Sequence, residues 1–340
     1  MPTLQTMAEI EKFIVIGSNS FSGACFSDYV LRNNPSAEVL GISRSPEYNN
    51  CFLPYKQSGE DRFSFYQLDL NKDLVKMVEV IQEFRPEYIV NFSAQGMVAQ
   101  SWDQPEQWFQ TNCLGMMGLV HELKEDDYLK RYVQISSPEV YGSCSGRIKE
   151  DAPLNPSTPY AASKASGDLS LIPYFKNYNF PLVYTRATNV YGACQQLYRI
   201  IPRTILYMKM GRKIQLQGGG KAVKSYIHIQ DVSDATLKIA RSGTNGETYH
   251  ISPEGDGISI YDLIERIAVK LGKQVGDCIE VVEDRKGQDI AYVIDSSKIR
   301  SELDWTTLIN LDEGLDKVIA WLEEHYEELI HLPQEYIHKP

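Results

Sequence analysis

The run Lys12-Phe-Ile-Val-Ile-Gly-Ser-Asn-Ser-Phe-Ser-Gly23 decides the fold that we predict for this chain. Its first five residues form a short apolar strand, and a helix pattern continues from the loop to Arg32. Backbone N–H groups at such a helix N-terminus bind pyrophosphate, so the loop is typical of a dinucleotide site. Ser20 replaces the usual middle glycine, and a generic strand-to-helix turn is the alternative interpretation. The predicted contacts are Gly17, Ser20, Phe21, Ser22 and Gly23.

Strands and helices continue to alternate through the first half of the chain. Apolar runs of strand length are bounded by turn residues, and helix patterns near 71–84, 103–124 and 158–178 separate several of them. This alternation predicts an α/β fold with a Rossmann-like, doubly wound parallel sheet. The further predicted strands are Glu38–Ile42, Phe63–Leu68, Tyr88–Phe92, Arg131–Ser136 and Leu182–Arg186.

The pattern loosens after about Asn189, which indicates a second, smaller lobe. We predict a dinucleotide-binding Rossmann domain at 12–188, with returning segments near 224–251, and an interleaved α/β substrate lobe at 189–330. The elements expected after residue 189 are helices near 199–210 and 258–271, strands near 225–229 and 247–251, a glycine turn at 218–220, an acidic helix at 311–329 and a polar tail.

Composition excludes several classes of function. The chain has 340 residues, 43% of them hydrophobic, which is enough for a sizeable core. Its net charge of −11 argues against a nucleic-acid or anionic-membrane partner. No secretory segment or apolar run of membrane-spanning length is present. The six cysteines show no Cys-x-x-Cys spacing, so we predict a cytoplasmic protein with reduced thiols and no metal site.

An acid/base group is predicted around the fifth strand. Tyr160 and Lys164 are four residues apart in a helical segment, so they share a face, and an ammonium beside a phenol lowers the pKa of the phenol. Ser137 and Glu139 follow the strand end, where loops carry chemistry above a parallel sheet. The Tyr-x-x-x-Lys spacing alone is weak evidence, because the chain contains 21 tyrosines.

Residues at other strand ends are candidate cofactor contacts. Ser43-Arg44-Ser45 stands where NAD-binding chains usually carry an acid, and Arg44 favours the 2′-phosphate of NADP over NAD. A solvated Arg44 is the alternative. Asp69 and Leu70 are placed to contact adenine, although Asp69 could equally cap a helix. Ala94 is predicted beside the cofactor and Gln95 beside the substrate.

Basic and amide side chains in the second half could hold an anionic substrate. Each is most simply a solvated surface group, but together they would form the cationic patch that a nucleotide diphosphate needs. These candidates are Asn189, Arg199, Arg203, Lys224 and Arg285.

Taken together, these residues resemble the extended short-chain dehydrogenase/reductase family, in its nucleotide-sugar epimerase and dehydratase branch. The resemblance covers about residues 12–329 and depends on the order of its motifs. They are Gly17 to Gly23, Thr111-Asn112, Ser137, Tyr160 with Lys164, Asn189-Val190-Tyr191-Gly192, Tyr226-Ile227-His228, Asp231-Val232 and Asp284-Arg285-Lys286-Gly287.

The resemblance implies roles for several residues. Tyr160 would take the proton of the sugar 4-hydroxyl, Lys164 would hold the nicotinamide ribose, and Ser137 would hydrogen-bond the same hydroxyl. The substrate, a nucleotide-diphosphate sugar, would lie against Asn189, Arg199, Lys224 and Arg285. The helices near 103–124 and 158–178 would pair with a second subunit in a four-helix bundle, giving a homodimer.

The triplet Ser137-Pro138-Glu139 bears on the reaction. It aligns with Thr-Asp-Glu in dTDP-glucose 4,6-dehydratases and Thr-Ser-Glu in GDP-mannose 4,6-dehydratases, which places Glu139 to remove the carbon-5 proton. Pro138 has no proton to donate to the departing hydroxyl. We therefore expect a nucleotide-sugar 4,6-dehydratase, with a 4-epimerase or 4-keto-sugar reductase as the alternative enzyme. A cofactor-binding regulatory protein is the non-enzymatic alternative.

Overall fold

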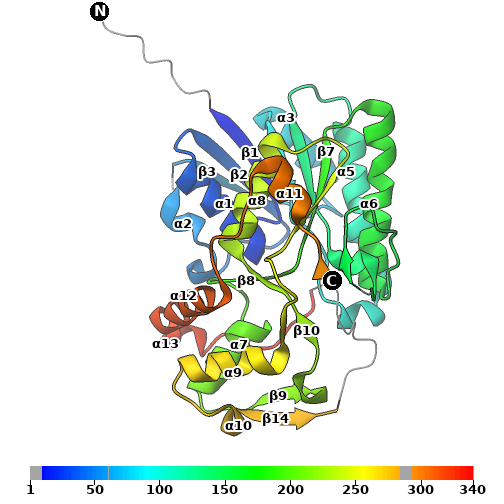
Figure 1. Cartoon of the computed structure of the whole chain (residues 1–340). Coiled ribbons are helices and arrows are strands. Elements are labelled where there is room, and N and C mark those ends of the chain that lie inside the picture. Colours follow the sequence, from blue (N-terminus) through cyan, green and yellow to red (C-terminus); the bar gives the residue numbers. More distant parts are fainter. Residues whose placement is uncertain (1–9, 60, 145, 284–292, 340) are drawn as a thin grey trace, which may run out of the picture.

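The computed structural model describes residues 10–59, 61–144, 146–283 and 293–339, and its centre is a seven-stranded sheet (Figure 1). All neighbouring strands are parallel, which confirms the doubly wound α/β prediction. From one edge to the other, the strands are β12 (Thr248–Ile251), β7 (Leu182–Ala187), β5 (Arg131–Ile135), β4 (Tyr88–Asn91), β1 (Glu11–Ile16), β2 (Ala37–Ser43) and β3 (Phe63–Gln67).

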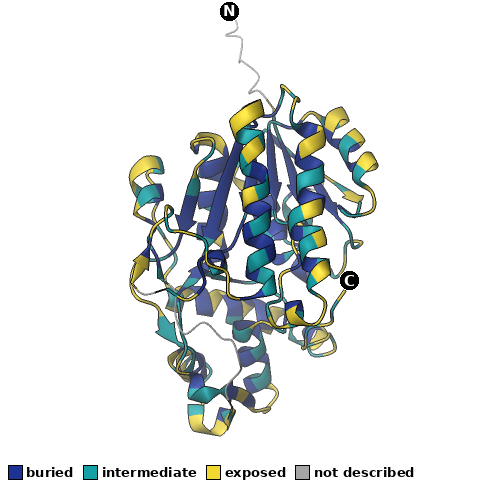
Figure 2. Ribbon diagram, turned by 90° about the vertical axis from the view of Figure 1, so that its right-hand side faces the viewer, coloured by how far each residue is buried: buried dark blue, intermediate teal, exposed yellow. Residues whose placement is uncertain are grey.

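Helices cover both faces of the sheet because successive side chains of a buried strand point to opposite sides. In β1, Phe13 and Val15 pack on one side, whereas Ile14 and Ile16 pack on the other. Figure 2 shows the strands buried between helices whose outer faces are exposed. On the first side lie α1 (Phe21–Asn33), α8 (Ile229–Ser242) and α11 (Ser297–Leu303), and on the second α3 (Leu74–Phe84), α5 (Met116–Leu123) and α6 (Pro159–Tyr178).

The predicted single helix near 103–124 is interrupted. The structure has α4 (Pro105–Phe109), then the π-helical turn η3 (Gln110–Gly115), then α5. A π-turn inserts an extra residue into the helical ladder and is frequent at functional sites. Side-chain periodicity did not reveal this insertion.

The smaller lobe has its own apolar core and lies below the sheet in Figure 1. Its strand β9 (Ile214–Gln217) pairs in parallel with β14 (Ile279–Val282). The lobe is interleaved with the sheet, because α8, which was not predicted, and β12 return to it. The lobe's helices are α7 (Ile200–Lys209), α9 (Ile260–Lys270), α10 (Val275–Cys278), α12 (Leu311–Glu324) and α13 (Tyr326–Leu329).

Short elements complete the chain. Among the helices of the described residues, none is long and apolar enough to cross a membrane. The remaining strands form three pairs, β8 (Asn189–Tyr191) with β11 (Tyr226–His228), β10 (Val223–Lys224) with β13 (Ile258–Ser259), and β6 (Arg147–Ile148) with β15 (Val293–Ile294). The short helices are η1 (Asn50–Phe52), α2 (Tyr55–Ser58), η2 (Ala99–Trp102), η4 (Pro138–Tyr141) and η5 (Gly218–Gly220).

A glycine in α6 tests how tightly α6 packs against η3. A Cβ built on Gly167 would lie 2.1 Å from the backbone oxygen of Asn112, so Gly167→Ala should push the two helices apart and cost about 1–3 kcal/mol of unfolding free energy. Urea denaturation measures this loss. The matched control is Gly118→Ala in α5, where the nearest atom is the flexible Leu74 Cδ2 at 3.3 Å. Equal stabilities for the two variants would contradict the close approach.

Candidate active site

The loop after β1 forms a cradle at the N-terminus of α1. Gly17 has φ +84°, and a Cβ on Gly23 would lie 2.3 Å from the Gly17 oxygen, so the helix approaches the loop as closely as only glycine permits. The Ser20 hydroxyl accepts the Gly23 N–H at 3.1 Å and caps the helix. The first N–H groups of a helix have no intrahelical acceptor. This geometry fits the diphosphate of a dinucleotide, and the Ser20 side chain is turned into the cap.

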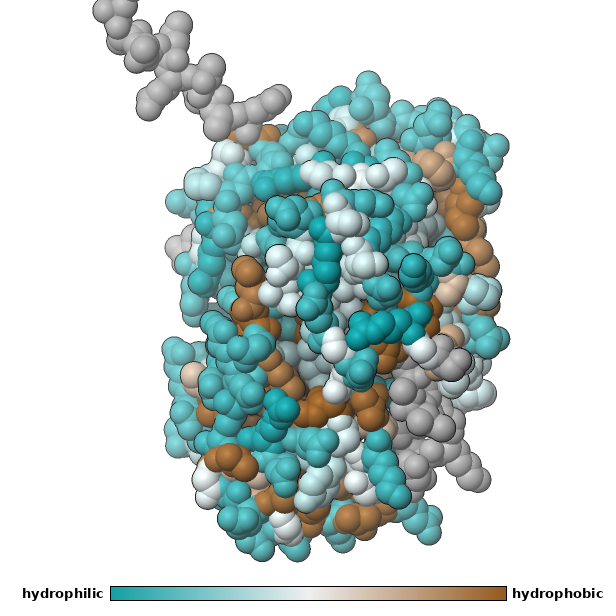
Figure 3. Space-filling model, viewed as in Figure 1, coloured by the Kyte–Doolittle hydropathy of each residue, from teal (hydrophilic) through white to brown (hydrophobic). Residues whose placement is uncertain are grey.

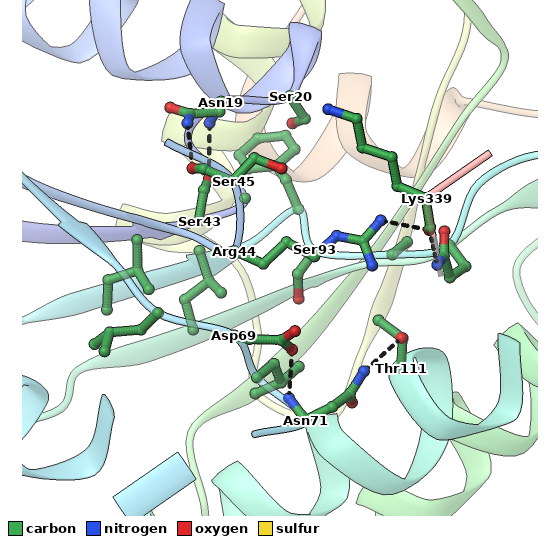
Figure 4. A pocket seen from close by; sticks show the side chains of 18 of the residues that line it. Asn19, Ser20, Ser43, Arg44, Ser45, Asp69, Asn71, Ser93, Thr111 and Lys339 are labelled. Atoms are coloured by element: carbon green, nitrogen blue, oxygen red, sulfur yellow. Dashed lines mark hydrogen bonds between the residues drawn. The ribbon is translucent and has the colours of Figure 1, made fainter. Parts of the chain in front are cut away.

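A cavity of about 280 Å³ opens beside this loop, at the carboxyl ends of the strands (Figure 4). Of the predicted cofactor and substrate residues, its wall contains Gly17, Ser20, Arg44, Asp69, Leu70, Ala94 and Gln95. The other cofactor candidates near the loop, Phe21, Ser22 and Gly23, form the first turn of α1 and are not part of the wall.

Hydrogen bonds fix the cavity wall at the ends of β2 and β3. The Asn19 N–H donates to Ser43 Oγ at 2.9 Å, which holds the phosphate loop against the end of β2. The Arg44 guanidinium donates to the carbonyl of Lys339 at 2.8 Å. Asp69 accepts the Asn71 N–H at 2.9 Å and does not cap α3, whose N-cap is Asp73. The alternative of Asp69 as the helix cap is therefore wrong.

The π-turn η3 fixes the end of β4. Asn112 accepts the Gln95 N–H at 2.9 Å and donates to the Gln95 carbonyl at 3.1 Å and to Ser163 Oγ at 2.9 Å. The Asn112 side chain therefore joins the β4 loop to α6 next to Lys164. Thr111, one residue earlier, accepts a hydrogen bond from Asn71 at 2.9 Å.

The four predicted catalytic residues gather at the end of β5, outside the wall of the cavity in Figure 4. Ser137 caps the short helix η4 and accepts the Glu139 N–H at 3.3 Å. Pro138 fits the first position of η4 because that position needs no N–H donor. Tyr160 lies in the first turn of α6 and Lys164 one turn further.

The expected lowering of the Tyr160 pKa is wrong for the protein without cofactor. Burial raises the pKa of the Tyr160 phenol above its ordinary value, and the Glu139 carboxylate raises it further. A hydrogen bond with the Ser137 side chain and the charge of Arg199 act in the opposite direction. The Lys164 ammonium is turned to the strand, where it donates to the Ile135 carbonyl.

Lys164 is buried, and its ammonium donates to the Ile135 carbonyl at 2.7 Å. Burial lowers the Lys164 pKa to about 8, while the Asp168 carboxylate one turn further along α6 raises it and Arg186 lowers it. Lys164 therefore loses its proton more readily than an exposed lysine.

A buried ion pair lies next to the four predicted catalytic residues and fixes the position of α6. Arg186 on β7 donates to Asp168 Oδ2 at 2.8 Å, and both side chains are 5% exposed. Ser136, next to the predicted catalytic residue Ser137, donates to the same oxygen at 2.5 Å. Arg186 also donates to the Tyr141 hydroxyl, which meets His250 Nε2 at 2.7 Å. The sequence prediction missed this network, although the four-residue spacing of Lys164 and Asp168 was a usable signal.

Three further predicted substrate residues lie on β8, at the start of α7 and on β10. Asn189 starts β8 and donates to the Ser225 carbonyl at 3.1 Å. Arg199 precedes the first residue of α7 and makes no side-chain capping bond, and Lys224 lies on β10. Arg285 lies outside the described residues. A second cavity, of about 480 Å³, lies within the smaller lobe. Its wall contains Arg203, Arg212, Lys213, Lys221, Glu280 and Glu335.

A comparison with protein families shows to which family the chain belongs. The family model described as GDP-mannose 4,6 dehydratase matches residues 14–318, which include the phosphate loop, the acid/base cluster and most of the smaller lobe. The chain belongs to this family. Membership in the GDP-mannose 4,6-dehydratase family accounts for the motif order from the phosphate loop to the segment 226–232, and for the fold.

Relatives of similar length support this assignment. The dTDP-glucose 4,6-dehydratase of Neisseria meningitidis serogroup B is 28% identical over 92% of this chain and 93% of its own. The crystal structure of dTDP-glucose 4,6-dehydratase from Bacillus anthracis, in complex with NAD, has a TM-score of 0.84 and 29% identity, and covers 94% of this chain and 98% of that one.

An epimerase has the same fold. UDP-glucuronic acid 4-epimerase from Bacillus cereus matches with a TM-score of 0.83 and 24% identity, over 93% of this chain and 100% of that chain. Fold alone therefore does not separate dehydration from epimerisation.

The lowered pKa of Lys164 can be measured directly. In cofactor-free protein with ¹³C-labelled lysines, we expect one Cε resonance to titrate with a midpoint near pH 8, because burial destabilises the charged ammonium, while exposed lysines titrate at about 10.4. The resonance should be absent from the spectrum of Lys164→Met. Titration of every lysine above pH 10 would contradict the buried environment.

Proposed function

We propose that this protein is a nucleotide-sugar 4,6-dehydratase, which oxidises carbon 4, eliminates water across carbons 5 and 6, and returns hydride to carbon 6. The observation that carries the proposal is a carboxylate beside the catalytic tyrosine. Glu139 lies close enough to Tyr160 to raise the pKa of the phenol. The dehydratase names of the family model and of the relatives above support the same reaction.

The dinucleotide site described above fits a nicotinamide cofactor. We assign the cofactor to residues 12–188 with the returning segments near 224–251, and the nucleotide sugar to residues 189–330. When bound, an oxidised nicotinamide would accept the hydride from carbon 4, and its positive ring would favour the Tyr160 phenolate. Tyr160 then takes the proton of the 4-hydroxyl, Ser137 holds that hydroxyl, and Lys164 holds the nicotinamide ribose.

Glu139 has the second role. The 4-keto group acidifies the hydrogen on carbon 5, and the Glu139 carboxylate takes that proton. Pro138 has no proton to give the departing hydroxyl, so Ser137, the protonated Glu139 or a water would donate it. Gln95, Asn189, Arg199, Lys224 and Arg285 would hold the substrate.

Pro138 is also the observation that favours a second candidate. A 4-epimerase or 4-keto-sugar reductase needs Tyr160 and Lys164 but no acid for the departing hydroxyl. Because Pro138 occupies that position, elimination has one fewer donor here. Isomerisation without loss of mass, or consumption of free reduced cofactor, would establish this alternative.

The substitution Glu139→Gln tests the elimination step. The protein is incubated with GDP-, dTDP-, UDP- and CDP-hexoses, with NAD or NADP supplied, and mass spectrometry follows the loss of one water. The parent should dehydrate one sugar, and Glu139→Gln should lose at least about a hundredfold in rate, because a general base contributes 10²–10⁴-fold.

The matched control for this test is cofactor binding. Glu139→Gln should bind the dinucleotide like the parent, since Glu139 is outside the cofactor cavity. Full dehydratase activity in this variant would reject the role of Glu139. The same panel tests our proposal that Arg44 favours NADP, against the NAD held by the Bacillus anthracis relative.

We further propose a homodimer in the cytoplasm. Apolar atoms gather along the edge of the molecule where Figure 1 draws α6 (Figure 3). Leu114, Leu169 and Tyr178 on η3 and α6 are 50%, 54% and 48% exposed, which is typical of an interaction face. The six cysteines are free, which suits a reducing compartment, and cell fractionation tests the location.

A charge on this face should separate the subunits. Leu169→Glu would bury a carboxylate in an apolar interface, so we expect the mass measured by light scattering at micromolar concentration to fall from dimer to monomer. The matched control is Val269→Glu, which also replaces an exposed apolar side chain with a carboxylate. Val269 lies on α9 in the other lobe and is 70% exposed. A monomeric parent protein, or a dimeric Leu169→Glu variant, would reject the proposed interface.

A further inference from the structure

Residues 333–339, which we name the strap, run from the smaller lobe to the cofactor cavity. Sequence analysis assigned them to a polar tail, but the structure packs them on one side. Gln334, Tyr336 and His338 are partly buried, whereas the residues between them are exposed. This period of two is that of an extended segment lying on a surface. In Figure 1 the segment leaves α13 and ends beside the other lobe.

The first part of the strap is attached to the smaller lobe. Arg212 donates to Gln334 Oε1 at 2.6 Å, and Glu335 belongs to the wall of the cavity of about 480 Å³. The Tyr336 ring meets the edge of the Tyr198 ring at 5.3 Å between centroids. These contacts bring the strap next to Arg199, the predicted diphosphate ligand.

The end of the strap is attached to the Rossmann domain. The His338 imidazole stacks on the buried Trp108 ring of α4, with centroids 5.3 Å apart and planes 5° from parallel. Its Nε2 lies 2.7 Å from Gln107 Oε1. The Lys339 carbonyl accepts hydrogen bonds from Arg44 at 2.8 Å and Gln95 at 2.9 Å. The strap therefore contacts both lobes and ends in the wall of the cofactor cavity.

Lys339 forms part of the wall of the cofactor cavity and leaves the cavity open. The cavity of about 280 Å³ stays open beneath the strap, and Figure 4 shows the Lys339 side chain extending toward Ser20 of the phosphate loop. Within the described residues, the Lys339 ammonium has no hydrogen-bond or ion-pair partner. A segment that imitated the cofactor would bring an anion to this loop, whereas Lys339 brings a cation.

We propose that the strap is part of the cofactor site, with the Lys339 ammonium as a ligand of the dinucleotide diphosphate, and that it holds the cofactor in place between turnovers. The family match ends at residue 318 and assigns no role to this segment. The inference deepens the proposed function, because a dehydratase returns its hydride and has no need to release the cofactor. It rests on cofactor binding alone and not on the elimination step.

The test is the rate of NADH release in the absence of sugar, with NADPH and NADP replacing NADH and NAD if the panel above shows that the chain uses NADP, since both cofactors carry the diphosphate. NADH bound to the full chain is displaced with excess NAD, and the loss of nicotinamide fluorescence is followed by stopped flow. Lys339→Glu replaces attraction to the diphosphate with repulsion and should speed release about tenfold or more. His338→Ala removes the stacking on Trp108 and should also speed release.

Two control variants distinguish the effect of the Lys339 charge on NADH release from the effect of any other substitution in the strap. Lys339→Arg keeps the cation and should release NADH at the parental rate. Ile337→Ser, at a strap position that is 63% exposed, should do the same. A chain ending at Leu332 should release NADH at least as fast as Lys339→Glu.

Two results would overturn the proposal. Unchanged release from both Lys339→Glu and the shortened chain would show that the strap is not part of the cofactor site. Slower release or tighter binding by the shortened chain would show that the strap competes with the cofactor. Neither result depends on dehydratase activity, so the proposed function could stand when this inference fails.

Discussion

The arrangement of the candidate active site depends on one buried ion pair, that of Asp168 on α6 with Arg186 on β7. Removing one member of such a pair leaves a buried charge, which typically costs about 3–5 kcal/mol. The pair holds α6 against the sheet, and the hydrogen bond of Ser136 with Asp168 connects it to the end of β5, next to Ser137. The positions of Tyr160 and Lys164 follow from the placement of this helix.

The sequence predicted the sheet well because most of its parallel strands are buried and are therefore continuous apolar runs, whereas the edge strand β3 is partly exposed. The six strands expected in the first half were found within one residue or two of their predicted ends. The helix α8 was missed, although it carries a strong apolar stripe, because its start at His228 was interpreted as part of a strand. The π-turn in the helix after residue 104 was missed because one inserted residue barely changes the periodicity.

The positions of the candidate residues could be predicted where local spacing carries information, but not where contacts are distant in sequence. Ser137 lies after a strand and Tyr160 at the start of a helix, as their local sequence indicated, and their catalytic roles remain predictions. The pKa of Tyr160 could not be predicted from the Lys164 spacing, because burial of the phenol outweighs it. Contacts such as Arg44 with Lys339 join residues 295 apart in sequence, and no local pattern records them.

The return of β12 and α8 to the sheet has a consequence for the autonomy of the two lobes. Val232, Ala235 and Ile239 of α8 help to cover the apolar face of the sheet beside α1, and Tyr29 of α1 hydrogen-bonds Asp234 at 2.8 Å. A fragment that stopped at residue 188 would leave this face open to water and β7 without its outer neighbour. The two lobes therefore fold as one unit. Replacing one lobe with that of a relative would separate the sheet from α8 and β12, which complete it.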